Sequence, residues 1–151
     1  MDKRQQIDAV RNELALLLAA TGGLDEAALT IPGIGEWSVR EVIAHITGWA
    51  LLDTRILQRL ARGERPLPEG EEYGTGEERN PGYAAEARTK TAAAVIDELR
   101  AAFAALIDAA EALPEERFEQ GRTAQRIMQS DGSDHMAAHR REIEEFSRRP
   151  S

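Results

Sequence analysis

The chain contains three histidines and no cysteine, and the positions of those histidines are its strongest chemical signal. His135 and His139 are four residues apart, so on a helix they lie on one face. His45 lies on the apolar face of another predicted helix. Three neutral imidazoles can hold a divalent ion and leave its other coordination positions to water or substrate. If the two helices face each other, these residues predict a metal centre.

Each histidine taken alone has a plainer interpretation. A single imidazole on an apolar helix face is usually a core side chain with a satisfied hydrogen bond, and His-x-x-x-His pairs also arise by chance. Burying three imidazoles without partners would cost on the order of 1–3 kcal/mol each, and a shared ion would remove that cost. On spacing alone, the metal centre and three unrelated histidines are equally supported.

Two aspartates lie on the same predicted helix faces. Asp131 is one turn before His135, where it would serve as a fourth ligand, as a carboxylate that orients a ligand, or as a general base. It is better explained as a helix cap, with Asp134 at the third position. Asp53 lies two turns after His45, and we expect it to pair with an arginine or to hold a substrate group.

Length, composition and charge narrow the class of protein. A chain of 151 residues that is 42% hydrophobic and 30% charged predicts one globular domain over residues 1–151. The net charge of -8 argues against a nucleic-acid partner, because a phosphate backbone repels an acidic surface. No stretch is long enough to span a bilayer, and Asp2, Asp8 and Glu13 interrupt the region where a signal peptide needs a clean apolar run. We therefore expect a cytoplasmic protein with a small-molecule substrate and with neither a nucleic-acid nor a membrane partner.

Apolar residues recur at helical spacing in four long stretches, and no alternating run indicates a strand. The predicted helices cover about Lys3–Ala20, Ser38–Leu60, Ala84–Leu113 and Thr123–Arg148. The stretch Gly63–Gly82, which is rich in Gly, Pro and Glu and holds Tyr73, predicts an irregular crossover that serves either as a lid or as a solvated connection. Gly132 predicts a break or kink in the last helix, because glycine costs about 1 kcal/mol inside a helix.

The predicted helices have distinct faces. Ser38 and Glu41 form a capping box at the start of the second helix, whose inward face is apolar except for His45 and Asp53. The opposite face of that helix is predicted to meet solvent through Arg40, Glu41, Thr47, Arg55, Gln58 and Arg59. The third helix carries a heptad seam made of Val95, Leu99, Ala102, Leu106, Ala109 and Leu113. The inward row of the last helix is Asp131, His135, Ala138, His139, Ile143 and Phe146.

Three segments resemble the DinB-like, or YfiT-type, family of four-helix bundles. Gly35–Ile46, with the sequence GEWSVREVIAHI, is similar to the family's entry to its second helix. Gly48-Trp49 places a tryptophan one turn after the histidine, and Asp131–Ile143 has the Asp-x-x-x-His-x-x-x-His-x-x-x-Ile spacing of the last helix. The resemblance runs over nearly the whole chain. It implies an all-α, up-down-down-up four-helix bundle with a long crossover between helices 2 and 3.

The resemblance also carries chemical implications. In that family the matched histidines bind a divalent metal, commonly nickel, zinc or iron, which makes His45, His135 and His139 the expected ligands. Characterised members use low-molecular-weight thiols in transfer or isomerisation reactions. An ion there lowers the pKa of a thiol, or of water in a hydrolytic reaction. Many members are dimers, so the resemblance makes a homodimer an expected assembly.

Two other interpretations stay open at the level of sequence. One branch of the family opens a reactive ring in a genotoxic metabolite and needs no ion. A stress-response binding bundle would instead hold a closed structural metal, with Asp131 as its fourth ligand. Relatives often carry aromatic residues where this chain has Ser133 and Met136. That departure predicts a smaller or looser rim around the site.

Overall fold

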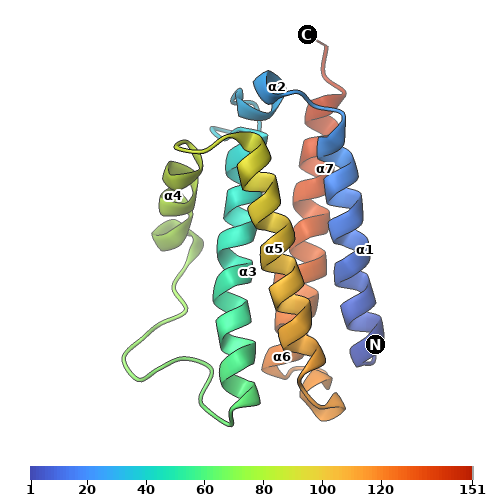
Figure 1. Cartoon of the computed structure of the whole chain (residues 1–151), viewed down its shortest axis with the longest axis vertical. Helices are drawn as coiled ribbons and strands as arrows, with labels where there is room; N and C mark the ends of the chain where they lie inside the picture. Colours follow the sequence, from blue (N-terminus) through green and yellow to red (C-terminus); the bar gives the residue numbers. More distant parts are fainter. Residues whose placement is uncertain (151) are drawn as a thin grey trace.

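Helices make up all the long elements of the computed structural model, which describes residues 1–150. Four long helical elements lie side by side (Figure 1): α1 (Lys3–Gly22), α3 (Val39–Ala61), α5 (Ala92–Glu111), and a C-terminal run of α6 (Thr123–Arg126), η2 (Ile127–Asp134) and α7 (His135–Ser147). The colours of Figure 1 show α1 and α7 running upward and α3 and α5 running downward. The predicted all-α, up-down-down-up bundle is therefore confirmed.

Three short elements join the long ones: α2 (Glu26–Thr30), α4 (Gly76–Ala87) and the 3-10 turn η1 (Glu115–Phe118). The capping box at the start of α3 is present, since Ser38 Oγ accepts a hydrogen bond from the Glu41 N–H at 3.3 Å. Because α3 and α5 run in the same direction, the chain between them must return along the bundle. The crossover that contains α4 makes this return (Figure 1).

The crossover is more ordered than predicted. The prediction of an irregular Gly63–Gly82 is confirmed only up to Thr75, and the prediction of one helix over Ala84–Leu113 is wrong. Residues from Gly76 onward form α4, and the chain turns before α5 begins at Ala92. Thr75 and Thr91 cap these two helices by accepting from the backbone N–H groups of Glu78 and Ala94. Glycine and proline signals are local, and packing of α4 against α3 overrides them.

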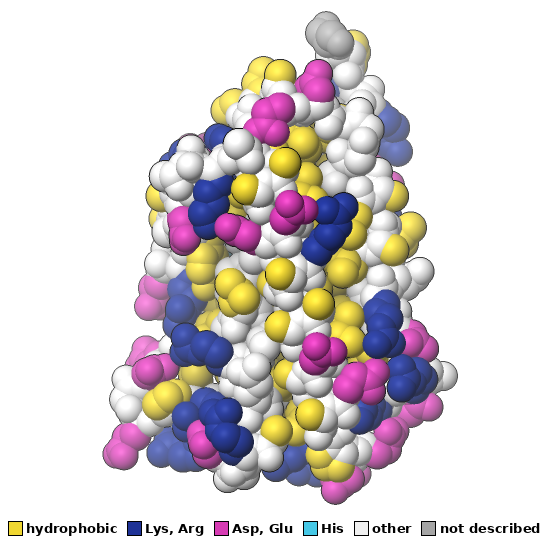
Figure 2. All heavy atoms as spheres, viewed as in Figure 1, with side chains coloured by type: hydrophobic (Ala, Val, Ile, Leu, Met, Phe, Trp, Pro, Cys, Tyr) yellow, Lys and Arg dark blue, Asp and Glu magenta, His cyan; other side chains and the backbone are white. Residues whose placement is uncertain are grey.

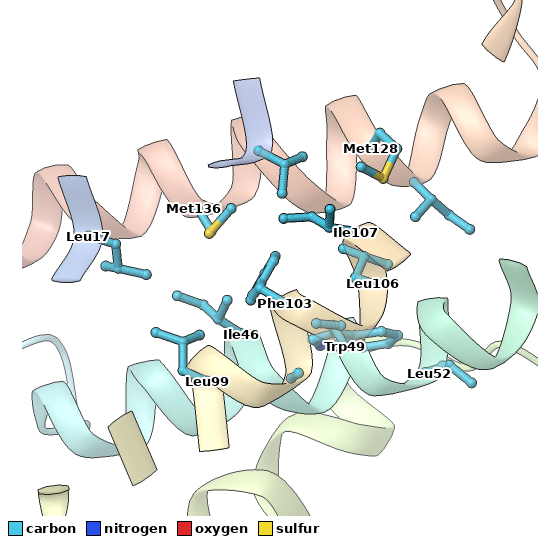
Figure 3. Close-up of a cluster of buried hydrophobic side chains, with 14 of the residues drawn as sticks. Leu17, Ile46, Trp49, Leu52, Leu99, Phe103, Leu106, Ile107, Met128 and Met136 are labelled. Atoms are coloured by element: carbon cyan, nitrogen blue, oxygen red, sulfur yellow. The ribbon is translucent and has the colours of Figure 1, made fainter. Parts of the chain in front are cut away.

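Helix α3 is buried on two sides, because α5 covers one side and α4 the other. The heptad seam of α5 is confirmed, since all six of its residues are buried. Glu41 and Thr47 were predicted to meet solvent, yet they are only 4% and 5% exposed. Glu41 forms an ion pair with Arg88, which follows α4, at 2.9 Å. Figure 3 shows core side chains that point toward one another, among them Leu17, Ile46, Leu99, Phe103 and Met136.

The C-terminal run is continuous at Gly132, where a break or kink was predicted. Residues Ile127–Asp134 form a π-helical segment, whose wider turn shifts the faces of the helix that follows. Gly132 is buried, and a Cβ there would lie 3.0 Å from Val10 Cγ2 of α1. This close approach accounts for the glycine. The shift also corrects the predicted inward row, because Ala138 is exposed and Met136 is fully buried.

Helix α4 approaches α3 closely at Gly48. The ring of Tyr83 occupies the space in which a Cβ on Gly48 would lie. We therefore expect Gly48→Ala to lower the free energy of unfolding by about 1–3 kcal/mol, as overpacking of a well-packed contact does. In a Tyr83→Ala background the sign should reverse, because alanine is favoured over glycine in a helix by up to about 1 kcal/mol. Urea denaturation of the four proteins in this cycle measures both values, and equal effects in the two backgrounds would contradict the assigned contact.

Candidate metal centre

Three imidazoles meet between α3 and the start of α7. The Nε2 atom of His45 lies 2.9 Å from that of His135 and 3.1 Å from that of His139, and the last two are 3.0 Å apart. Within residues 1–150, these side chains form the one group of three or more possible metal-ligating residues whose ligand atoms all lie within 4.8 Å of one another. The structure thus brings together the three residues that the sequence nominates. That they bind a metal is taken up below as a proposal.

The outer ring nitrogens show where two of the protons lie. Trp49 Nε1, which can only donate, lies 2.8 Å from Asn80 Oδ1, so this atom is an acceptor. His45 Nδ1 lies 2.8 Å from the same oxygen and must therefore donate to it. His139 Nδ1 donates to Glu142 Oε1 at 2.6 Å. In the neutral state, the Nε2 atoms of His45 and His139 consequently carry lone pairs rather than protons.

The third imidazole is held in the same way from outside the cluster. The backbone of Asp131 supplies a hydrogen-bond partner to His135. Burial, followed by the charge of His139, lowers the pKa of both His45 and His135 to about 4. These two rings are therefore neutral at pH 7. The Nε2 atoms of His45 and His139 face each other at 3.1 Å without a proton between them, so they repel unless a cation lies among the three rings.

The spacing of the cluster fits a divalent ion. Metal–imidazole bonds are about 2.0–2.1 Å long, so ligand nitrogens at tetrahedral angles would be about 3.3–3.4 Å apart, and nitrogens at right angles about 2.8–3.0 Å apart. The observed 2.9–3.1 Å agrees better with right angles. Three imidazoles would leave the remaining coordination positions of such an ion to water or substrate. The residues present therefore fit an ion with open positions.

Next to the histidines lies a cluster of two aspartates and a tyrosine. The Tyr73 hydroxyl lies 2.8 Å from Asp53 Oδ1 and 3.0 Å from Asp131 Oδ2. One hydroxyl proton serves only one of these contacts, so the other needs a proton on a carboxyl group. Burial, and then the charge of Asp131, raises the pKa of Asp53 to about 8, and burial also raises the pKa of Asp131. The cluster therefore carries an extra proton near pH 7.

These contacts correct two sequence predictions. Asp131 does not cap a helix, because it lies inside the π-helical segment with its carboxylate on Tyr73. Asp53 contacts Tyr73 rather than an arginine. Tyr73 and Asn80 are site residues that were not predicted from the sequence. The one sequence signal for them was the presence of a tyrosine in the long crossover. Spacing along the chain does not tell which side chain of an irregular segment reaches a face of the bundle.

A cavity of about 330 Å³ opens onto this site. This volume is typical of small-molecule sites. It reaches His45, His135, Tyr73, Asn80 and Asp131, and Trp49 forms part of its wall. The aromatic rim predicted to be absent comes from elsewhere in the fold, because the rings of Trp49 and Tyr73 are 5.1 Å apart. Met136 cannot shape the rim, since it is 0% exposed. Whether the rim is smaller or looser than in relatives stays a prediction, but aromatic side chains do line it.

A model of the DinB superfamily matches residues 6–140 of this chain. The chain belongs to the DinB superfamily. This membership agrees with the sequence resemblance, and it accounts for the element order described above. No curated protein sequence matches the chain.

Three solved structures are similar in fold to this chain. The colibactin self-resistance protein ClbS, crystallised in complex with a dsDNA, has a TM-score of 0.85 at 13% identity, covering 99% of this chain and 98% of that one. DfsB, described as a sibling lethal factor precursor, has a TM-score of 0.81 at 17% identity, covering 97% and 95%. An uncharacterised protein from Escherichia coli UTI89 has a TM-score of 0.80 at 12% identity, covering 97% and 92%. Identities this low establish a shared fold.

The prediction that excludes nucleic acid is wrong, because ClbS, a protein with the same DinB fold, was crystallised with dsDNA. The prediction rested on the net charge of -8, which averages the whole surface. Contact with phosphates depends instead on where cations gather locally. On the face drawn in Figure 2, the Lys and Arg side chains lie in separate groups and are not spread evenly. Among residues 1–150, no helix is long and apolar enough to cross a membrane.

Asn80 provides a direct test of how the crossover supports the histidines. Its Oδ1 accepts from both His45 and Trp49. Partners that orient a metal ligand are worth about 10–100-fold in metal affinity, so we expect Asn80→Ala to weaken divalent-metal binding by that factor. Asn80→Asp keeps the acceptor and should stay within about fivefold of the parent affinity. Titration calorimetry on metal-free protein measures both values, and an unchanged affinity in Asn80→Ala would contradict the role.

Proposed function

We propose that this protein is a divalent-metal-dependent enzyme that acts on a small electrophile in the cavity beside the three histidines. His45, His135 and His139 would hold the ion. The observation that carries the proposal is the meeting of three Nε2 atoms at 2.9–3.1 Å, with the outer nitrogens of His45 and His139 held by Asn80 and Glu142. Imidazole ligands suit zinc, iron and nickel alike, so the add-back experiment described below has to identify the metal.

The bound ion would act as a Lewis acid that lowers the pKa of a nucleophile, either water or a low-molecular-weight thiol. The chain's own residues then have to receive the proton that the nucleophile gives up. Asp131 lines the cavity and shares a proton with Asp53 through the Tyr73 contact. We assign proton acceptance to Asp131. Tyr73 keeps its proton, because burial and the two carboxylates raise its pKa above the ordinary value.

The wall of the cavity suits a substrate with a flat or apolar part. The Trp49 indole lies 5.1 Å from the Tyr73 ring and 6.1 Å from the Tyr83 ring, measured between centroids. The guanidinium of Arg79 lies over the Trp49 ring at 5.9 Å. This packing holds Trp49 in one orientation, which helps to fix a bound electrophile relative to the histidines.

The other two interpretations from the sequence receive less support. A closed structural site needs Asp131 as a fourth ligand, but its carboxylate is engaged by Tyr73 and lies outside the group of converging ligand atoms. A metal-independent hydrolase would use the same cavity and the same aspartates. It gives no reason for the three Nε2 atoms to converge.

The test begins with metal-free protein. Nickel, zinc or iron is added back, the bound metal is quantified, and a panel of small electrophiles is assayed with and without a thiol cosubstrate. The proposal expects about one ion per chain and turnover that depends on it. Turnover that persists at full rate without metal would overturn it and favour the metal-independent hydrolase. A requirement for thiol separates transfer or isomerisation from hydrolysis.

A second candidate function is action on or close to duplex DNA. It is favoured by the fold shared over 99% of this chain with ClbS, whose crystals contain dsDNA. Fluorescence anisotropy with a labelled duplex tests it, and a real phosphate contact should weaken as salt rises. Binding below about 100 µM at 150 mM salt would support this function, since nonspecific DNA binders at physiological salt reach about 1–100 µM.

A further inference from the structure

A second cavity lies at the end of the bundle where α3 ends and α6 begins. It has a volume of about 310 Å³, and Arg117, Arg122, Arg126, Thr123 and Glu64 are among the residues that line it. The two parts of the chain that form it are far apart in sequence, and Figure 1 shows them near the lower end of the molecule. None of its lining residues belongs to the histidine cavity.

The residues that line this cavity carry more positive than negative charge. Glu64 is the one carboxylate that lines the cavity, and its two oxygens are held by Arg59 and Arg62 at 2.9 Å each. Its negative charge is therefore already compensated from outside the cavity. In the described part of the chain, Arg117 and Arg126 form no ion pair. The closest carboxylate oxygen to Arg122 is that of Glu119, at 3.9 Å.

The backbone explains how these arginines come together. Gly121 has a φ of 85°, a conformation that residues with a side chain rarely adopt. The turn that it allows reverses the chain between η1 and α6. Arg117 before the turn and Arg126 after it consequently line the same cavity, and Thr123 adds a hydroxyl group. Three guanidinium groups therefore line one cavity that is large enough for an anion, and of the three only Arg122 has a carboxylate of residues 1–150 within ion-pair distance, that of Glu119 at 3.9 Å.

We propose that this cavity binds a phosphate group through Arg117, Arg122 and Arg126. A guanidinium offers a planar pair of N–H donors that matches two phosphate oxygens, and a phosphate has enough oxygens to serve several arginines together. The Thr123 hydroxyl supplies one further donor. The phosphate comes either as a free phosphate group or as part of a nucleic-acid backbone. The site lies outside the histidine cavity, so the proposal stands apart from metal dependence.

The test uses the purified full chain and two probes, inorganic phosphate and a short DNA duplex. NMR titration should shift the amide resonances of Gly121, Thr123 and their neighbours, with a Kd for inorganic phosphate on the order of 1 mM. Arg126→Gln should weaken binding by about tenfold, because it removes a charge-assisted hydrogen bond. Arg100→Gln removes the same charge from an exposed position on α5, and it should change the Kd by less than about twofold.

Each outcome bears on the proposal. Phosphate binding without duplex binding assigns a free phosphate group to the site. Duplex binding that phosphate displaces, and that weakens in Arg126→Gln, assigns a phosphodiester backbone. The proposal is overturned if neither probe shifts these resonances at about 10 mM phosphate or about 100 µM duplex. It is also overturned if Arg117→Gln and Arg126→Gln both bind as the parent does, with circular dichroism showing that they fold.

Discussion

Metal-free His135→Ala should gain at most about 1.4 kcal/mol of stability from nickel, zinc or iron, whereas the parent protein should gain about 4 kcal/mol. An ion present at about 1,000 times its Kd stabilises the folded state by about 4 kcal/mol. His135 contributes one of the three converging Nε2 atoms, 2.9 Å from that of His45 and 3.0 Å from that of His139. Its removal leaves two ligands, and metal affinity should fall by more than about 100-fold. Thermal unfolding with and without added metal measures the difference.

For each protein, the stability with metal is compared with the stability without metal. The packing lost with the His135 ring affects both values equally and therefore cancels. Asp134→Asn is the matched control, because Asp134 precedes His135 on the same helical run and is exposed. It should keep the full stabilisation by metal. If His135→Ala were stabilised by the ions as strongly as the parent, the three-histidine centre would be excluded. Turnover by His135→Ala at the parent rate would likewise exclude the proposed mechanism.

Replacing Asp53 with asparagine should change how stability depends on pH. Burial and the neighbouring Asp131 raise the pKa of Asp53 from 3.8 to about 8 in the folded state. Between these values the folded protein holds a proton that the unfolded chain has released, so stability falls as pH rises through this window. One proton corresponds to about 1.4 kcal/mol per pH unit. An amide resembles the protonated acid in shape and does not ionise, so Asp53→Asn should lose this dependence.

The difference in the free energy of unfolding between variant and parent should grow with pH. Between about pH 5 and pH 8 the free energy of unfolding of the variant should rise relative to that of the parent by more than about 1 kcal/mol. Urea denaturation of metal-free protein at several pH values measures this. Asp108→Asn alters an exposed aspartate on α5 and should show no such trend. A difference between Asp53→Asn and the parent that is the same at every pH would contradict the shared proton.

Much of the fold follows from local sequence patterns. The heptad seam of α5 and the capping box of α3 depend on spacings of three and four residues, which the helical repeat makes visible in the sequence. The same repeat places His135 and His139 on one face, and the Gly35–Ile46 segment indicates a family of bundles. These features involve neighbours within a helix, so their energies are set locally.

The surroundings of the histidines depended on contacts between distant parts of the chain. The glycines and proline of the crossover predict an irregular segment, yet Tyr83 packs on Gly48 and Asn80 accepts from His45 and Trp49. Those contacts exist only once α3 is formed, and they stabilise α4 against its local preference. In the same way, burial beside Asp131 and Tyr73 gives Asp53 its proton. By itself the sequence determined which residues share a helix face. Only the tertiary structure decided which faces meet, because that choice rests on long-range packing that no spacing along the chain records.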